Sequence, residues 1–511
     1  MKRPYYISTA IPYVNAKPHI GHALEYIQTD AIARYERLMN KDVFFLTGSD
    51  ENSLKNVQAA EKLGMSTEQF VDEQYNHFAK FKSLLNIFFD DFIRTTEKRH
   101  FLGAQKFWSQ FKPEDLEKRI YKGLYCVGCE SFLKEDELVD GKCPDHKTVP
   151  EQIEEENWFF KLSNYQDILR KMIENDVIKV SPDFRKNEWL AFLDRGLEDF
   201  SISRSQERAR GWGVPVPGDE SQIMYVWVDA LSNYITALDF GSDQKKYNQY
   251  WVQKEGEREV VHVIGKGIAK FHVLYWPAML LSAGIPLPTE IFVHGYVTNE
   301  GEKISKSLGN VIDPDDVVKE YGTDAVRYYL LGAISSTKDG DYSKERFEDF
   351  YTAHLVNGVG NLTSRILTMI EKYADGKIPE KSTGEWMEKT IGFWVEYEES
   401  MKNYLFDNAI KAVNEYISQV DLVISTEKPW EKAKNGEDIT KLLYELVESL
   451  RHIALALLPI IPETAEKIFV QLGYTKEQIQ TFIFDEEKEW GRLIPGTLAK
   501  KGEILFQRLQ K

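Results

Sequence analysis

Residues 5–24 have the sequence YYISTAIPYVNAKPHIGHAL and place a short apolar strand, an irregular proline-containing loop and a helix start in succession. The strand covers about 5–8, and the prolines mark the loop. From Ile20 onward, apolar residues recur at helical spacing, and a second apolar strand follows at 43–47. A strand, a helix and a strand of these lengths predict a βαβ unit, and hence a parallel sheet covered by helices.

The predicted helix opens on the tetrapeptide His19-Ile20-Gly21-His22. The first N–H groups of a helix lack partners within the helix and carry a partial positive charge, so phosphates dock there readily. The two imidazoles add donors, and Gly21 lets a nucleotide approach the backbone. Two ordinary histidines near a turn would give the same letters, but the position directly after a strand and a loop favours a phosphate site.

A second motif, Lys303-Ile304-Ser305-Lys306-Ser307, follows an expected strand at 291–297 and a turn. Activation of a carboxylate by ATP is an in-line attack on the α-phosphorus, and it depends on positioning and charge stabilisation. Two lysines in one loop can neutralise the leaving pyrophosphate. A solvated basic loop is the ordinary alternative for this motif alone, but the two motifs together predict ATP-dependent activation.

Length and composition limit the class of protein. With 511 residues the chain is too long for one core, so two to four domains are expected. No stretch approaches the roughly 20 apolar residues of a membrane span, and the N-terminus has no secretory pattern. We therefore expect a cytoplasmic protein without membrane contact. A net charge of -17 argues against DNA binding, but it leaves room for RNA recognition by local basic patches and base stacking.

The sequence changes character along the chain. A helical pattern fills about 54–120, and short turns, cysteines and acidic runs then extend to about 225 before apolar strands return. After about 350 only long helical patterns remain. We predict a catalytic domain in two halves, 1–115 and 226–350, an insertion at 116–225, and a helical domain with a C-terminal linker at 351–511.

The insertion contains all three cysteines of the chain. Cys126 and Cys129 form one chelating pair, and Cys143 and His146 form another a short loop later. Two such pairs predict a tetrahedral site without an open position, so a bound zinc would be structural. Three buried cysteines and a surface histidine are the alternative.

In this combination the motifs resemble those of class I aminoacyl-tRNA synthetases. Over nearly its full length the chain resembles the methionyl-tRNA synthetase family, in its short bacterial type with a single zinc knuckle. The resemblance extends beyond the two motifs to segments 10–15, 225–234, 271–272 and 276–279. It implies a Rossmann-like parallel-sheet catalytic domain of α/β class with a zinc-knuckle insertion, followed by an all-α C-terminal anticodon-binding bundle.

The resemblance also assigns residues. Catalytic roles would fall to His19, His22, Lys303 and Lys306, and ATP contacts to the same four with Gly21 and Ser305. The methionine pocket would comprise Ile11, Tyr13, Asp50, Trp227, Ala230, Tyr234, Ile268 and His272, with Asp50 holding the α-ammonium group. The anticodon would be bound by Asn361, Arg365 and Trp430. An aromatic pocket suits a polarizable thioether, although by spacing alone the aromatic residues could belong to the core.

The implied reaction joins L-methionine and ATP into methionyl-adenylate with release of pyrophosphate, followed by transfer of methionine to the terminal adenosine of tRNA(Met) for initiation and elongation. Mg²⁺ would accompany ATP, one Zn²⁺ would be structural, and a monomer is expected. The sequence leaves three alternatives open: another class I synthetase, a catalytically silent RNA-binding paralogue, and a nucleotidyltransferase that uses no tRNA.

The chain departs from the family pattern in several places. The family commonly has Glu-His-Gly after Asp50, whereas this chain has Glu51-Asn52-Ser53, so we expect a contact to the substrate or ribose at the pocket rim to differ. Leu231 stands where proline is frequent in some branches, and the segment 205–213 is longer than usual. Arg204, just before that segment, fits either a phosphate or carboxylate contact or a structural ion pair.

Overall fold

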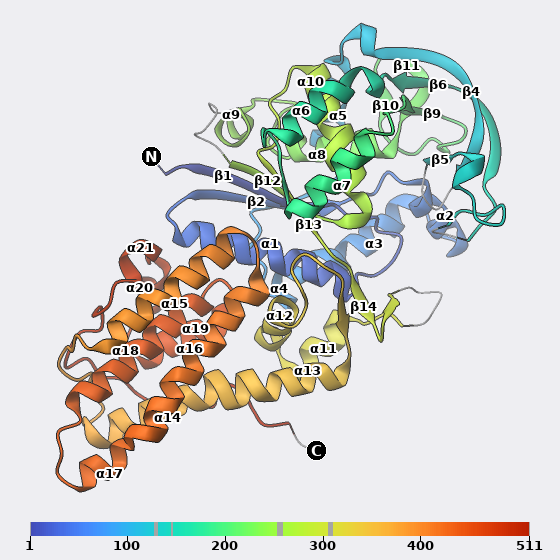
Figure 1. Cartoon of the computed structure of the whole chain (residues 1–511). Coiled ribbons are helices and arrows are strands. Elements are labelled where there is room, and N and C mark those ends of the chain that lie inside the picture. Colours follow the sequence, from blue (N-terminus) through green and yellow to red (C-terminus); the bar gives the residue numbers. More distant parts are fainter. Residues whose placement is uncertain (1, 127–130, 145–146, 253–258, 305–309, 510–511) are drawn as a thin grey trace.

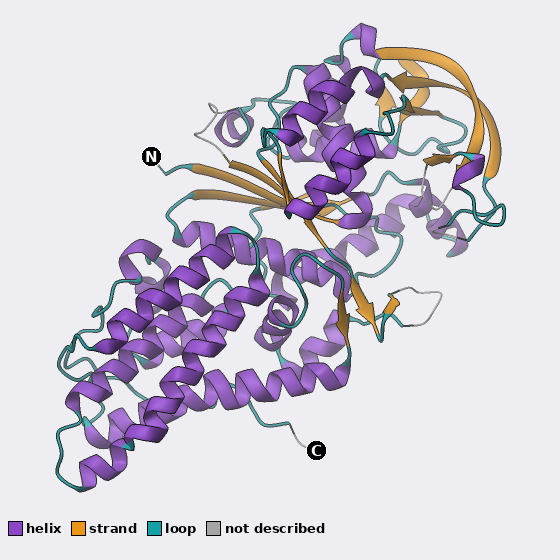
Figure 2. Cartoon of the chain, in the orientation of Figure 1, coloured by secondary structure: helices purple, strands orange, loops and turns teal. Residues whose placement is uncertain are grey.

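The computed structural model describes residues 2–126, 131–144, 147–252, 259–304 and 310–509, and it places a parallel sheet beside a helical bundle (Figures 1 and 2). The six-stranded sheet has the order β3-β2-β1-β12-β13-β7, with every neighbouring pair parallel. Its strands are β1 (Pro4–Thr9), β2 (Asp42–Ser49), β3 (Asp91–Arg94), β7 (Lys179–Ser181), β12 (Glu259–Gly265) and β13 (Glu290–His294). The predicted α/β class with a Rossmann-like sheet is confirmed.

Two hydrophobic cores lie on the two faces of this sheet. Along β1, Tyr5 and Ile7 pack into one core, and Tyr6 between them packs into the other, as the alternation of a strand requires. The first core contains α1 (Ile20–Leu38), and the second contains α5 (Lys98–Ser109), α8 (Val226–Thr236) and α10 (Trp276–Ala283), which Figure 1 shows on the other side of the sheet. The chain leaves β1 toward β2 and leaves β12 toward β13, so the crevice between β1 and β12 is the switch point where such sheets bind ligands.

The other elements around the sheet are short. They are α2 (Leu54–Lys62), α3 (Thr67–Ala79), α4 (Phe81–Leu84), α9 (Lys245–Tyr250), the π-helical turn η5 (Phe271–Tyr275) and the small sheet of β14 (Val297–Asn299), β15 (Glu302–Lys303) and β16 (Gly340–Tyr342). The helical pattern expected to run from 54 to 120 is interrupted by β3 and ends before 120. With only four residues, β3 is too short to show a period of its own.

The expected insertion forms antiparallel sheets. One contains β4 (Leu116–Cys126), β5 (Ser131–Leu133), β6 (Glu151–Phe160) and β8 (Phe200–Ser201), and the other contains β9 (Ser203–Ser205), β10 (Pro215–Val216) and β11 (Asp219–Met224). Two helices, α6 (Gln166–Glu174) and α7 (Asp183–Leu193), flank β7. Because β7 pairs with β13 in the main sheet, the range 116–225 also contributes an edge strand to the catalytic fold.

The C-terminal part is helical, as predicted. Its helices are α11 (Pro314–Tyr321), α12 (Thr323–Gly332), α13 (Lys344–Phe350), η7 (Tyr351–Gly360), α14 (Asn361–Tyr373), α15 (Glu385–Lys402), α16 (Phe406–Glu427), α17 (Pro429–Lys434), α18 (Thr440–Leu457), α19 (Pro462–Gln471), α20 (Lys476–Gln480) and α21 (Phe484–Glu487). The last segment returns to the body, where Leu498 bridges to Lys377 and the Tyr351 hydroxyl donates to the Gln507 carbonyl at 2.8 Å.

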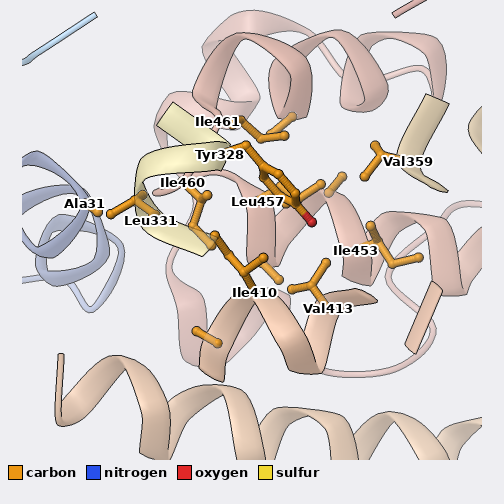
Figure 3. Close-up of a cluster of buried hydrophobic side chains, with 14 of the residues drawn as sticks. Ala31, Tyr328, Leu331, Val359, Ile410, Val413, Ile453, Leu457, Ile460 and Ile461 are labelled. Carbon is orange, nitrogen blue, oxygen red and sulfur yellow. The ribbon is translucent and has the colours of Figure 1, made fainter. Parts of the chain in front are cut away.

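The helical part and α1 share one continuous core. Figure 3 shows Ala31 of α1 and Leu331 of α12 beside Ile410, Leu457 and Ile460 of the bundle, and all of these side chains are buried. The bundle therefore packs directly on the helix that begins at His19.

A buried ion pair lies at the same junction. Arg327 of α12 and Asp30 of α1 are both inaccessible to solvent, and their charged groups lie 2.7 Å apart. The guanidinium also donates to the carbonyls of Ile460 at 2.8 Å, Pro459 at 3.2 Å and Leu85 at 3.1 Å. Burial alone would raise the pKa of Asp30, but the guanidiniums of Arg34 and Arg327 hold it below its ordinary value.

We expect the Arg327→Met substitution to lower the free energy of unfolding by about 3–5 kcal/mol, because it removes one of the two guanidiniums that pair with the buried Asp30 carboxylate and takes this donor from three carbonyls. Urea unfolding followed by circular dichroism would measure the loss. Arg195→Met, at an exposed arginine of the insertion, is the control and should change stability by less than about 0.5 kcal/mol. Equal effects of the two changes would contradict a structural role of the pair.

Candidate active site

A cavity of about 490 Å³ opens at the carboxyl ends of β1, β2 and β12, at the predicted switch point. Eight of the sequence-predicted residues line it: Ile11, Tyr13, His19, Gly21, His22, Asp50, Trp227 and Ile268. The sheet thus brings together side chains that are more than 200 residues apart in the chain.

The two histidines are held by the helix they begin. His19 is the N-cap of α1, and its Nδ1 accepts the N–H of Gly21 at 3.0 Å. Nδ1 of His22 accepts the N–H of His19 at 3.1 Å, and the two rings lie 4.1 Å apart. In a neutral imidazole whose Nδ1 accepts, the proton is on Nε2. Each ring is therefore a donor at Nε2 beside the positive end of the helix, which suits an anion such as a phosphate.

Described residues in and after the second motif lie at the same helix end. Ile304, within the motif, and Val311, four residues after it, line the cavity, and the N–H of Ile20 donates to the Ile312 carbonyl at 3.0 Å. The backbone of Lys303 ends strand β15. Ser305 and Lys306 lie outside the described residues.

Another part of the cavity lining is aromatic and includes the carboxylate of Asp50. Trp227, in the first turn of α8, stacks on Phe271 with ring centroids 3.7 Å apart, and Tyr13 meets its edge at 6.4 Å. Asp50 follows β2 and is 3% exposed; its N–H donates to the Pro12 carbonyl at 2.8 Å. An anionic group beside an apolar wall can hold an ammonium group next to an apolar side chain.

Three residues predicted for this pocket lie behind its wall. Ala230, Tyr234 and His272 are buried and are not among the described residues that line the cavity. His272 donates from Nδ1 to the Ile268 carbonyl at 3.0 Å, so its Nε2 accepts the Tyr234 hydroxyl at 2.8 Å. Burial lowers the pKa of His272 to about 4, so this ring is neutral near pH 7.

The sequence reasoning missed a polar pair on the cavity wall. Glu25 accepts the N–H of Ala10 at 2.9 Å through one carboxylate oxygen and lies 2.9 Å from Nε2 of His294 through the other. The His294 Nδ1 faces the Gly295 carbonyl at 2.7 Å. Two features of the sequence indicate this pair. Glu25 is three residues after His22 on the same helix face, and His294 ends a parallel strand.

A glycine allows another close approach on this wall, between Gly267 and Tyr296. A Cβ atom on Gly267 would lie 1.9 Å from the hydroxyl of Tyr296, so only glycine fits there without displacing that ring. Both residues line the cavity. This contact joins two segments that follow different strands, so spacing in the sequence could not reveal it.

The residues predicted to bind metal and RNA lie elsewhere. Cys126 and Cys143 are both buried, whereas Cys129 and His146 lie outside the described residues. Within the described ranges no group of three possible metal ligands occurs, and two of the four predicted ligands are not in those ranges.

The helical domain holds the three predicted anticodon residues. Asn361 and Arg365 share a face of α14, where Asn361 is exposed and Arg365 pairs with Asp421 of α16. Trp430, in the first turn of α17, is 41% exposed. A tryptophan that only capped a core would be covered, so the indole is available to a partner.

Arg204, in β9 of the insertion, is buried. It donates to the Ser203 carbonyl at 2.7 Å and to the Ser201 hydroxyl at 2.9 Å, and it lies over the ring of Tyr225 at 4.4 Å. These contacts support a structural role in this region, outside the cavity described above.

A Rossmann-like sheet with a histidine-capped helix mouth and a second loop meeting it defines a class I aminoacyl-tRNA synthetase. The profile of the family described as tRNA synthetases class I (M) matches residues 5–152 and 146–367, and that of the anticodon-binding domain of tRNA ligase matches 387–509. The chain belongs to the methionyl-tRNA synthetase family. Among the described residues, no helix is long and apolar enough to cross a membrane.

Individual relatives agree along the whole chain. The chain is 42% identical to the methionine--tRNA ligase of Thermotoga maritima, over 99% of this chain and 80% of that protein. It is 40% identical to that of Rhizobium meliloti, over 99% and 98%. The solved structure of Mycobacterium tuberculosis methionyl-tRNA synthetase in complex with methionyl-adenylate superposes with a TM-score of 0.92 at 37% identity, covering 99% of this chain and 100% of that one.

We expect His22 to remain neutral throughout the range pH 6–8. Burial, reinforced by the His19 ring, holds the pKa of His22 well below its ordinary value, so the ring gains a proton only at lower pH. Histidine ring-nitrogen NMR, assigned with a His22→Gln variant, should show the Nε2-protonated neutral form across this range. A midpoint at or above about 6.5, the value for a free histidine, would contradict the arrangement.

Proposed function

We propose that this chain is a methionine--tRNA ligase that first joins L-methionine to AMP and then transfers methionine to the terminal adenosine of tRNA(Met). The observation that carries the proposal is one cavity with two chemically different ends. Donors at the mouth of α1 suit a triphosphate, and Asp50 beside Trp227 suits an amino acid with an apolar side chain.

Each end has a distinct role in the first step. Asp50 holds the α-ammonium group and directs the methionine carboxylate toward the α-phosphorus of ATP. His19 and His22 donate to the phosphates, and Lys303 and Lys306 balance the charge that develops on pyrophosphate as it leaves. Ser305 and Gly21 contact ATP, and Mg²⁺ enters with ATP as part of the substrate. Ala230, Tyr234 and His272 set the depth of the methionine pocket from behind Trp227.

The first step is tested by pyrophosphate exchange into ATP with each of the twenty amino acids offered singly. We expect exchange with methionine at a rate well above that with the other nineteen, because only a flexible, polarizable and uncharged side chain suits the aromatic wall. Exchange with a different amino acid would still indicate a class I aminoacyl-tRNA synthetase, but it would contradict the assignment of the pocket to methionine. Absence of exchange in folded protein would favour a catalytically silent paralogue.

The helical domain reads the anticodon of tRNA(Met). The half-exposed Trp430 offers a stacking surface, and Asn361 and Arg365 on one face of α14 offer polar contacts to base edges. Because the bundle shares its core with α1, RNA bound to it is held in fixed register with the cavity.

Replacing Trp430 by alanine should lower kcat/KM for aminoacylation by about 5- to 100-fold, which corresponds to the free energy of stacking one base on an aromatic side chain. Pyrophosphate exchange should stay within about twofold, because the indole lies in the helical domain and outside the cavity. Leu422→Ala, at a 62% exposed apolar residue of α16, is the control and should leave both activities unchanged. Equal loss of both activities in the tryptophan variant would indicate a packing residue.

The remaining assignments complete the proposal. One structural Zn²⁺ is held by Cys126, Cys129, Cys143 and His146. The burial of Cys126 and Cys143 suits thiolates that are shielded from solvent. The catalytic halves are 1–115 and 226–350, with the insertion at 116–225 and the helical domain at 351–511. The enzyme acts as a cytoplasmic monomer.

A further inference from the structure

Asn52 lies at the centre of a buried hydrogen-bond network beside the proposed methionine pocket. Its Nδ2 donates to the Asp229 carboxylate at 2.8 Å and to the Thr95 carbonyl at 2.9 Å. Because both partners are acceptors, the orientation of the amide is fixed and both of its N–H groups are used. The side chain therefore joins the segment after β2 to α8 and to the end of β3.

Asp229 carries this network into α8. Its other oxygen lies 2.5 Å from Nε2 of His100, whose Nδ1 lies 2.8 Å from the Thr236 hydroxyl. Asp229 is in the first turn of α8, where the helix dipole favours a carboxylate. Asn52, His100 and Asp229 are all buried, so no water can replace a lost partner without rearrangement.

Trp227 is two residues before Asp229 in the same turn. Its ring is part of the cavity wall and stacks on Phe271. Among the described residues of the first turn of α8, Asp229 is the one whose side chain makes hydrogen bonds to other elements. A shift of Asp229 would therefore move the indole that closes the apolar end.

We propose that Asn52 is a positioning residue that sets the first turn of α8, and with it the place of the Trp227 ring in the methionine pocket. The proposal rests on the function proposed above. An amide supplies two donors at every pH, whereas a neutral imidazole supplies one. The asparagine therefore keeps both bonds without a charge of its own.

The test is a reciprocal exchange of donor and acceptor. Asn52→Asp keeps the shape of the side chain but places a carboxylate against Asp229 and removes both donors. Asp229→Asn leaves one amide oxygen where two carboxylate oxygens served Asn52 and His100, so one of these two bonds loses its acceptor. In the double variant the pair is re-formed with its roles exchanged, because the amide at 229 can donate to the carboxylate at 52 and still accept from His100.

Pyrophosphate exchange at pH 8, with methionine and ATP varied separately, provides the readout. Each single variant should raise the KM for methionine by about tenfold or more, the usual effect of losing a hydrogen bond to a charged group, with the KM for ATP within about twofold. The double variant should recover most of the loss; recovery is incomplete because the Thr95 carbonyl then faces an acceptor.

Asn76→Asp is the matched control, since it makes the same chemical change at an exposed asparagine of α3 whose Nδ2 donates to the Asp72 carbonyl at 3.0 Å. Thermal unfolding of every variant separates loss of fold from loss of position. An Asn52→Asp enzyme with unchanged methionine KM would overturn the proposal, and so would a double variant no better than the worse single one. If the wild-type enzyme itself showed no exchange with methionine, the proposed function would fail instead.

Discussion

The buried contact between Arg327 and Asp30 is the constraint on which the arrangement of this enzyme depends. A guanidinium without access to water must find an acceptor for each N–H direction. Here it finds the carboxylate of α1, carbonyls of Pro459 and Ile460 in the helical domain, and the carbonyl of Leu85. Only one relative placement of the bundle and α1 satisfies all of them. The helix whose N-terminus faces the cavity is thereby fixed to the helical part that matches the anticodon-binding domain of tRNA ligase.

The cavity follows from that placement. With α1 fixed against the sheet, its first turn must lie at the carboxyl ends of β1 and β12, and the Ile20–Ile312 hydrogen bond brings the segment after the second motif to the same point. Donors of the helix mouth therefore gather at one end of the cavity. Asp50 is placed by the end of β2 and by its backbone bond to Pro12, in the loop after β1. The strand order thus separates the N–H donors at the start of α1 from the carboxylate of Asp50 within one cavity.

The sequence predicted what depends on local pattern, and missed what depends on contacts between distant segments. The β1–α1–β2 unit, the helical bundle and the lining residues His19, His22 and Asp50 come from periodicity, motifs and strand ends. The strands β3 and β7 have four and three residues and gain their identity only by pairing with longer neighbours. The hydrogen bond between Tyr234 of α8 and His272 of η5 likewise could not be predicted from the spacing of either residue.

The edge strand β7 changes how the insertion relates to the catalytic domain. An inserted domain joined only through its two ends would be free to adopt any orientation over the cavity. Here Lys179–Ser181 pairs with β13, the strand that ends at His294 on the cavity wall, and Trp212 donates from its indole to the Glu51 carbonyl at 2.8 Å beside Asp50. The insertion is thus bound to the sheet at one edge and to the rim of the cavity at the other. A change that loosens it should reach the amino-acid end of the site first, because that is the end its contacts support.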